Sequence, residues 1–179
     1  FRNMQETVLN TEEIYRGRVI QLSVLDVRLP NGKTARRELI HHPGAVAIIA
    51  LDSANNVLLV RQYRMAAGRV LMEIPAGTLE PGEDPMVCAE RELQEETGYR
   101  PGKLEGFGGI YVAPGYTSEF IHHFIATDLT ASRLEMDEDE FIEAAFVPFT
   151  EALALIDRGE IIDGKSISGL LKVARRLGL

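Results

Sequence analysis

The chain has 179 residues, of which 45% are hydrophobic, enough to bury the core of one compact domain. Its formal net charge of -8 argues against a nucleic-acid-binding surface, and no apolar run approaches the ~20 residues that a membrane-spanning helix needs. Cys88 is the single cysteine, which excludes an internal disulfide, and the first ten residues lack the apolar stretch of a signal peptide. These features predict a cytoplasmic protein without nucleic-acid or membrane partners.

The pattern of strands and turns in residues 1–44 predicts a separate N-terminal β region. Residues 19–29 alternate in the manner of a strand, turn residues follow at 30–33, and residues 34–42 return as the partner strand. A two-stranded antiparallel hairpin is unstable by itself, so we expect it to pack on another surface, for which a second copy of the chain is the candidate. The sequence thus predicts a homodimer in which residues 1–44 dimerise and residues 45–179 form the main domain.

The rest of the chain alternates between strand and helix patterns. Residues 45–52 form an almost unbroken apolar run, which is typical of a buried strand. Helices are expected over residues 86–97, 150–157 and 166–177, with Thr150 as the cap of the second. Further strands are expected over residues 56–65, 70–77, 103–112, 120–129 and 141–149. The pattern predicts an α+β fold in which helices flank a mixed sheet.

Residues 77–99 hold the most informative pattern, a glycine-containing loop followed by a helix. Asp84 suits the N-cap, Pro85 the first helical position and Gly98 the C-terminal stop. Apolar residues three and four apart predict a stripe that faces the core, formed by Met86, Ala89 and Leu93.

Three carboxylates crowd this helix. Glu92 and Glu96 are four residues apart, and Glu95 lies beside them. Like charges at this spacing approach within about 6 Å and repel by a few tenths of a kcal/mol, so they need compensation. A hard divalent cation such as Mg²⁺, with Mn²⁺ as the alternative, would supply it. The competing interpretation is a solvated helix face with Arg91 and Arg100 as partners.

The loop and helix together resemble the Nudix box. The matching positions are Gly77, Glu83, the run Arg91-Glu92-Leu93, the pair Glu95-Glu96, and Gly98. Tyr99 departs from the pattern, since the family usually has a bulky aliphatic residue there, although an aromatic ring can fill the same packing role. The resemblance implies an α/β/α sandwich that hydrolyses nucleoside diphosphates linked to another moiety.

The resemblance also implies roles for single residues. Metal ligands would be the side chains of Glu92 and Glu96 together with the backbone carbonyl of Ala76. Glu95 would be a further ligand or position water, Glu83 would support the helix by hydrogen bonding, and Arg91 would hold the loop. Cations bound there would neutralise the pyrophosphate and activate water near neutral pH.

Three features are similar to the ADP-ribose pyrophosphatase subgroup. Pro114 lies sixteen positions after Gly98, where the subgroup has a proline near the terminal ribose. The N-terminal segment resembles the small domain through which these enzymes form swapped dimers. The acidic run 137–140 before a strand resembles their mobile acidic loop, which implies that Glu138 is the general base and Glu140 an additional metal ligand. Glu95, or the metal acting on water without a base, remain the alternatives to Glu138.

Substrate contacts follow from the same resemblance. Arg37 and Arg64 match positions that contact the diphosphate, although Arg36, Arg61 and Arg69 are equally basic neighbours. Adenine would meet Arg18 and Val19 of the second subunit, and Glu119 would hydrogen-bond ribose hydroxyls. The histidine pairs at 41–42 and 122–123 lie in predicted strands, where adjacent side chains face opposite ways, so structural roles are expected.

The expected function is the metal-dependent hydrolysis of ADP-ribose, or of a related nucleoside diphosphate sugar, to AMP and a sugar phosphate. The alternatives are a Nudix hydrolase of nucleoside triphosphates or RNA 5′ ends, and a nucleotide-sensing module without turnover. The low aromatic content of 7% disfavours RNA, and the intact box disfavours the sensing module.

Overall fold

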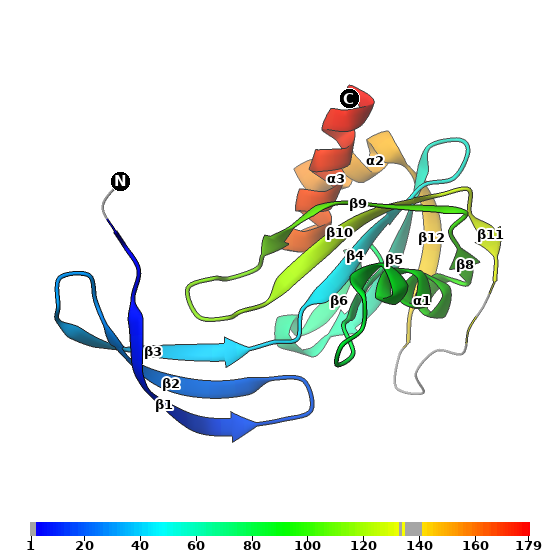
Figure 1. Cartoon of the computed structure of the whole chain (residues 1–179). Helices are drawn as coiled ribbons and strands as arrows, with labels where there is room; N and C mark the ends of the chain where they lie inside the picture. Colours follow the sequence, from blue (N-terminus) through cyan, green and yellow to red (C-terminus); the bar gives the residue numbers. More distant parts are fainter. Residues whose placement is uncertain (1–2, 133, 135–140) are drawn as a thin grey trace. The chain divides into compact units, whose positions relative to one another are not determined.

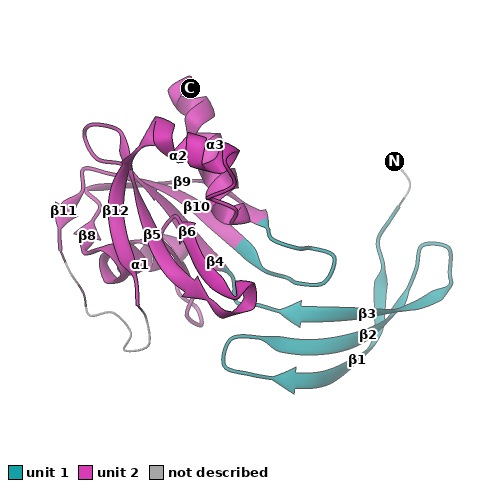
Figure 2. Ribbon diagram, turned by 180° about the vertical axis from the view of Figure 1, so that it is seen from behind, with its two compact units in different colours: residues 1–44, 111–120 teal, residues 45–110, 121–179 magenta. Residues whose placement is uncertain are grey.

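The computed structural model describes residues 3–132, 134 and 141–179. The chain divides into two units (Figure 2), one with residues up to 44 and 111–120, the other with residues 45–110 and 121–179. The loop 111–120 thus clusters with the N-terminal strands, whereas the predicted main domain of residues 45–179 included it. Among the described helices, none combines the length and the apolar content needed to cross a membrane.

The first unit contains a three-stranded antiparallel sheet in the order β1-β2-β3 (Figure 1). The predicted hairpin pairs from Gln21 opposite His41 to Arg28 opposite Thr34. The third strand was not predicted from the sequence, because its pairing with its neighbour contains two register shifts that break the alternation of side chains. The strands are β1 (Thr7–Arg16), β2 (Gln21–Arg28) and β3 (Thr34–His41).

The second unit is built around β4 (Ala45–Ala50), which is buried along its whole length. It pairs in parallel with β10 (Phe120–Thr127) and antiparallel with β7 (Ala76–Thr78), so the sheet β7-β4-β10-β9 is mixed as predicted. A second sheet has the order β12-β5-β6 and a short one pairs β11 with β8. The remaining elements are β5 (Asn56–Arg64), the 3-10 turn η1 (Met65–Ala67), β6 (Arg69–Glu73), β8 (Tyr99–Arg100), β9 (Lys103–Tyr111), β11 (Thr130–Ala131) and β12 (Glu143–Pro148).

Helices cover both faces of β4. The helices are α1 (Pro85–Thr97), α2 (Phe149–Asp157) and α3 (Gly164–Leu177). Alternate residues of β4 enter different cores: Val46 and Ile48 pack in the cluster that contains α1 side chains, while Ala47 and Ile49 pack in the cluster that contains those of α2 and α3. This alternation, which follows from the two-residue period of a strand, produces the α/β/α sandwich.

The strand expected over residues 70–77 is two strands in different sheets. β6 ends at Glu73 and pairs with β5, whereas β7 begins at Ala76 and pairs with β4. Pro75 lies between them and has no N–H to continue a ladder, although its carbonyl accepts a hydrogen bond from the Ile48 N–H at 2.8 Å. The chain therefore passes from one sheet to the other at this proline.

The ends of α1 are as predicted. The Asp84 carboxylate accepts hydrogen bonds from the Met86 and Val87 amides, Pro85 opens the helix, and Gly98 ends it in the left-handed region at φ 76°. The predicted apolar stripe was wrong at Met86, which is 48% exposed, because this residue lies at the edge of the stripe in the first turn, and Cys88 is buried instead.

Two other helix starts differ from the prediction. Thr150 is not a cap, since α2 already begins at Phe149 and has Pro148 in the cap position without a side-chain hydrogen bond. α3 begins at Gly164, two residues before the predicted start. Its cap is Asp163, whose carboxylate accepts a hydrogen bond from the Ser166 amide.

His123 of β10 is fully buried and serves the core, as expected for a structural histidine. Its ring stacks on Phe107 with centroids 5.5 Å apart, and its Nε2 lies 3.2 Å from the Lys165 carbonyl oxygen. Burial, helped by the charge of Lys172, lowers the pKa of the imidazole to about 4 from its ordinary 6.5. The ring is therefore neutral at physiological pH.

This pKa predicts acid sensitivity of the fold. The neutral imidazole contributes its full stabilisation above pH 6.5, and the contribution is lost as the pH falls from 6.5 towards 4, by about 3 kcal/mol in total. In urea unfolding at pH 7, 5.5 and 4.5, we expect the His123→Gln variant to lose less free energy of unfolding across this range than the unsubstituted chain. Identical losses in the two proteins would contradict the assignment.

Candidate active site

Glu92 of α1 points into a space beside Gly77, the first residue of the loop pattern. A Cβ atom built on Gly77 would lie 1.8 Å from the Glu92 carboxyl carbon and 2.0 Å from its Oε1. No residue with a side chain fits there unless Glu92 moves away. The glycine is therefore needed for close packing of β7 against the helix, in addition to any turn that the loop makes.

Glu96 lies one helical turn further on and is 5% exposed. Its Oε2 accepts a hydrogen bond from the backbone N–H of Ala76 at 3.0 Å. Ala76 is twenty residues away in sequence, and the packing of α1 on β7 brings the two together. The fold thus places Glu92 and Glu96 next to the two neighbouring backbone positions Ala76 and Gly77.

Arg91 is the common counter-charge of the loop and the helix. It forms a two-point hydrogen-bonded pair with Glu83, in which both N–O distances are 3.0 Å. Its Nη1 also donates to Glu92 and Glu95, each at 2.9 Å. Glu83 accepts a further hydrogen bond at 2.9 Å from the Glu80 amide. One guanidinium therefore holds three carboxylates, and its pair with Glu83 joins the loop to the helix.

The charges in this cluster shift one another's titration. The pair with Arg91 lowers the pKa of Glu83 to about 2, and it raises the pKa of the Arg91 guanidinium. Burial raises the pKa of the neighbouring Cys88 thiol, with the Glu83 and Glu92 charges adding to the effect. The cysteine is thus a protonated packing residue, which agrees with its expected role.

The carboxylates suit a hard divalent cation by their chemistry, because every side-chain donor among them is oxygen. Within the described residues, no three His, Cys, Asp or Glu side chains converge on one point, since Glu92 and Glu95 turn to Arg91 and Glu96 turns to the Ala76 amide. Glu92 and Glu95 have only 13% and 25% of their side chains exposed. This burial disfavours the alternative of a freely solvated helix face, although Arg91 is indeed a partner of the cluster.

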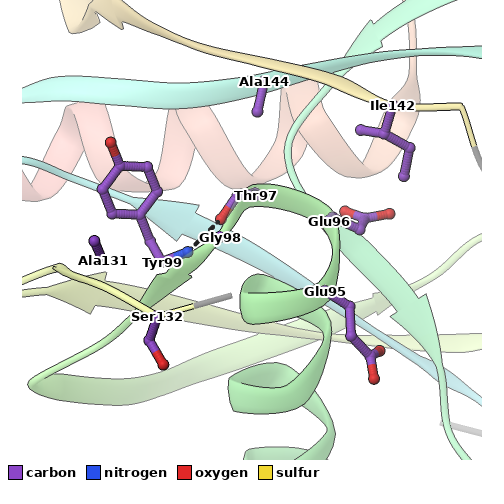
Figure 3. Close-up of a pocket in the computed structure, with 9 residues that line it drawn as sticks. All are labelled: Glu95, Glu96, Thr97, Gly98, Tyr99, Ala131, Ser132, Ile142 and Ala144. Carbon is purple, nitrogen blue, oxygen red and sulfur yellow. Dashed lines mark hydrogen bonds between the residues drawn. The ribbon is translucent and has the colours of Figure 1, made fainter. Parts of the chain in front are cut away.

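A hollow of about 560 Å³ adjoins the C-terminal end of α1. Figure 3 shows Glu95 and Glu96 projecting from the helix in different directions, with Glu96 on the side of Ile142. The hollow is lined by Glu95, Glu96, Thr97, Gly98, Tyr99, Ala131, Ser132, Ile142 and Ala144. Tyr99, the residue that departs from the usual box, packs edge-on against Phe146 at 5.4 Å between ring centroids. It thereby fills the packing role expected of a bulky residue.

Arg64 at the end of β5 is held by a buried carboxylate. Its Nε and Nη2 donate to the two oxygens of Glu73 at 3.0 and 2.7 Å. Glu73 is 1% exposed, whereas 40% of the Arg64 side chain is exposed. The arginine predicted to contact the diphosphate is thus fixed by a neighbour that the sequence analysis did not single out.

The predicted substrate residues of the first unit are found in two groups. Arg18 and Val19 line a hollow of about 320 Å³ together with His41 and His42. Glu119 lies 4.0 Å from His42, in the loop that contains Pro114.

Arg37 pairs with Glu6 at 2.6 and 3.1 Å in the same unit. Glu138 and Glu140 lie outside the described residues, so their predicted roles stay predictions.

A set of polar residues connected to Arg64 through Glu73 was not predicted from the sequence. They are Glu73, Asp163, Lys165 and Ser166. Glu73 could have been noticed as the single charged residue within the apolar run VLMEIP, and Asp163 as an N-cap residue three positions before Ser166. Nothing in the local pattern indicates that the two lie together.

This sandwich, with a glutamate-rich helix packed on a glycine-containing loop, defines a Nudix domain, and the chain belongs to the NUDIX domain family, whose family model matches residues 41–169. The chain is 42% identical over 167 residues to the ADP-ribose pyrophosphatase of Bacillus subtilis (strain 168), covering 92% of this chain and 90% of that protein. It is 44% identical over 165 residues to the methanol dehydrogenase activator of Bacillus methanolicus, covering 91% and 89%. A solved structure titled "Crystal structure of ADP compounds hydrolase" has a TM-score of 0.87 and 26% identity, covering 99% of this chain and 97% of that one.

The tight contact at Gly77 predicts a sensitive position. In Gly77→Ala the new methyl group overlaps the Glu92 carboxylate, so this side chain must leave its position, and we expect roughly a 10–100-fold loss of Mn²⁺ affinity in calorimetric titration. Gly106→Ala is the matched control, because its methyl group would meet Phe124 at an ordinary 3.4 Å. Equal Mn²⁺ affinity in the two variants would show that Glu92 does not hold a cation.

Proposed function

We propose that the protein hydrolyses the pyrophosphate bond of ADP-ribose, or of a related nucleoside diphosphate sugar, and forms AMP and ribose 5-phosphate from ADP-ribose. The observation that carries the proposal is the position of Glu92 and Glu96 beside Ala76 and Gly77: Glu96 accepts a hydrogen bond from the Ala76 N–H at 3.0 Å, and Glu92 occupies the space that a side chain at Gly77 would need. The names of the Bacillus subtilis relative and of the solved structure support the choice of substrate class.

The proposed cofactor is Mg²⁺, with Mn²⁺ as the alternative. The side chains of Glu92 and Glu96 and the Ala76 carbonyl would hold it, together with Glu95 and with Glu140 outside the described residues. When bound, such a cation neutralises the pyrophosphate and makes water more acidic. Arg91 and Glu83 keep α1 and the loop in register, so that the ligands stay in place while substrate enters.

The remaining roles concern substrate and proton transfer. Arg64 and Arg37 would bind the diphosphate oxygens, for which a planar guanidinium is suited. Arg18 and Val19 would contact adenine, and Glu119 the ribose hydroxyls, in the loop with Pro114. The general base would be Glu138, with Glu95 as the alternative.

A panel of substrates tests the proposal. With Mg²⁺ present, turnover of ADP-ribose and GDP-mannose is expected to exceed turnover of 8-oxo-dGTP and capped RNA. NADH belongs in the panel because it carries the same adenosine diphosphate group as ADP-ribose. Preference for the triphosphate or for the RNA end would replace the proposal with one of the alternative Nudix activities, and no turnover of any substrate would favour a sensing module.

A charge-removing variant tests whether Glu96 is a metal ligand without changing the shape of its side chain. Glu96→Gln keeps the shape of the side chain, and the lost metal interaction, worth several kcal/mol, should reduce kcat on the order of 10³-fold. The control is Glu90→Gln on the same helix, whose partner is the exposed Arg100. Near-normal turnover by Glu96→Gln would exclude Glu96 as a ligand.

We also propose a homodimer formed through the N-terminal region. The strand β1 exposes apolar side chains, including Val8 at 55% and Ile14 at 51%, which water does not favour. A second copy that covers them would remove this apolar surface from solvent.

Light scattering on a sizing column tests the dimer. The full chain is expected at twice its 19.9 kDa, and the variant Val8→Glu/Ile14→Glu at the mass of one chain, because buried charges oppose association. Leu171→Glu on α3, 52% exposed, is the control and should keep the dimer mass. A single-chain mass for the unsubstituted protein would rule the dimer out.

A further inference from the structure

A buried polar network lies between the end of β5, the end of β6 and the first turn of α3. The Glu73 carboxylate accepts hydrogen bonds from Arg64 on one side and from the Lys165 ammonium group, at 2.5 Å, on the other. Lys165 also donates to Asp163 at 2.9 Å, and its side chain is only 10% exposed. Two cations and two carboxylates therefore alternate, and the network is neutral as a whole.

The network is fixed to the backbone on both sides. Asp163 caps α3 and accepts hydrogen bonds from the Ser166 amide and hydroxyl, at 3.0 and 2.5 Å. The Ser166 hydroxyl oxygen in turn accepts from the Ile74 amide at 2.9 Å. Glu73 is thereby held through its own strand and through its salt bridges, so its carboxylate has a defined position.

Arg64 is the exposed end of this chain of contacts. Glu73 is the main cause of its raised pKa, and the negative charges of Glu96 and Asp163 add to it, so the guanidinium lies within electrostatic range of a proposed metal ligand. A two-point pair fixes the plane of the guanidinium as well as its location, which a single hydrogen bond does not. An arginine left without this partner would sample many rotamers in solvent.

We propose that Glu73 is a positioning residue that holds the Arg64 guanidinium in the orientation needed to bind the substrate diphosphate, and that Lys165 and Asp163 keep Glu73 in place. This inference rests on the proposed function, because it needs Arg64 to bind the diphosphate. Glu73 acts through Arg64 and touches neither the substrate nor the reacting atoms.

Orientation and charge make opposite predictions for Glu73→Gln. The substitution makes the site one unit more positive, so if charge alone mattered, an anionic diphosphate would bind more tightly. A glutamine offers Arg64 one acceptor oxygen in place of two, so the pair that fixes the guanidinium is broken. If orientation matters, the substrate therefore binds more weakly despite the added positive charge.

The experiment is a double-mutant cycle of Glu73→Gln and Arg64→Lys. Lysine keeps the charge of Arg64 but not its planar fork, so each single variant is expected to raise the KM for ADP-ribose roughly tenfold. The double variant should show no further increase, because Glu73 then has no guanidinium to orient. Calorimetric binding of a methylene analogue of ADP-ribose, which is not hydrolysed, should show the same pattern in Kd.

Two control variants separate the effect on Arg64 from the general loss of an ion pair and from the loss of charge. Glu143→Gln removes the partner of Arg61, an exposed pair at 3.3 Å that also involves β5, and should leave KM unchanged. Glu73→Asp keeps the charge but shortens the side chain by one methylene group, so it should give an intermediate KM, and it replaces Glu73→Gln if that variant does not fold.

The result that overturns the inference is an unchanged or lowered KM in both Glu73 variants. An effect of Glu73→Gln that adds to that of Arg64→Lys would also overturn it, since a structural residue acts independently of Arg64. Failure of the proposed function is a different result, namely that the unsubstituted protein hydrolyses no nucleoside diphosphate sugar. An active unsubstituted enzyme with an unaffected Glu73→Gln variant removes only the inference about Glu73.

Discussion

The hydrogen bonds of Arg91 are the interaction on which the site depends. Several carboxylates lie on or beside α1, and three of them are largely buried: Glu96 is 5% exposed, and the side chains of Glu83 and Glu92 are 11% and 13% exposed. Uncompensated charges at such burial would be costly. Arg91 compensates Glu83, Glu92 and Glu95 together, and in doing so it joins the loop to the helix. The positions of Glu92 and Glu95 follow from this one residue and, for Glu92, from the absence of a side chain at Gly77, whereas Glu96 is held by the Ala76 amide.

The local features of the site could be predicted from sequence because their causes are local. Asp84, Pro85 and Gly98 determine where α1 begins and ends, and the spacing of the glutamates fixes which share a face. The packing of Met86 could not be predicted, since a residue at the edge of a stripe is buried or exposed according to its neighbours in space. The extra strand β1 was missed because register shifts interrupt its alternation.

The long-range ion pairs could not be predicted from the sequence. Glu73 and Lys165 are 92 residues apart, and their contact depends on how α3 packs against the sheets. A charged residue inside an apolar strand indicates that some partner exists, because a buried carboxylate without one is unstable. It does not indicate which residue the partner is, and for that reason the support of Arg64 became visible only in the folded chain.

Pro75 has a consequence for how the two halves of the site move. The four residues from Glu73 to Ala76 cross from one sheet to the other, with the anchor of Arg64 at one end and the backbone neighbour of Glu96 at the other. Because this peptide is short and the φ torsion of Pro75 is fixed, a displacement at one end is transmitted to the other. Any sliding of one sheet past the other would therefore shift the proposed diphosphate-binding group and the proposed metal ligand together.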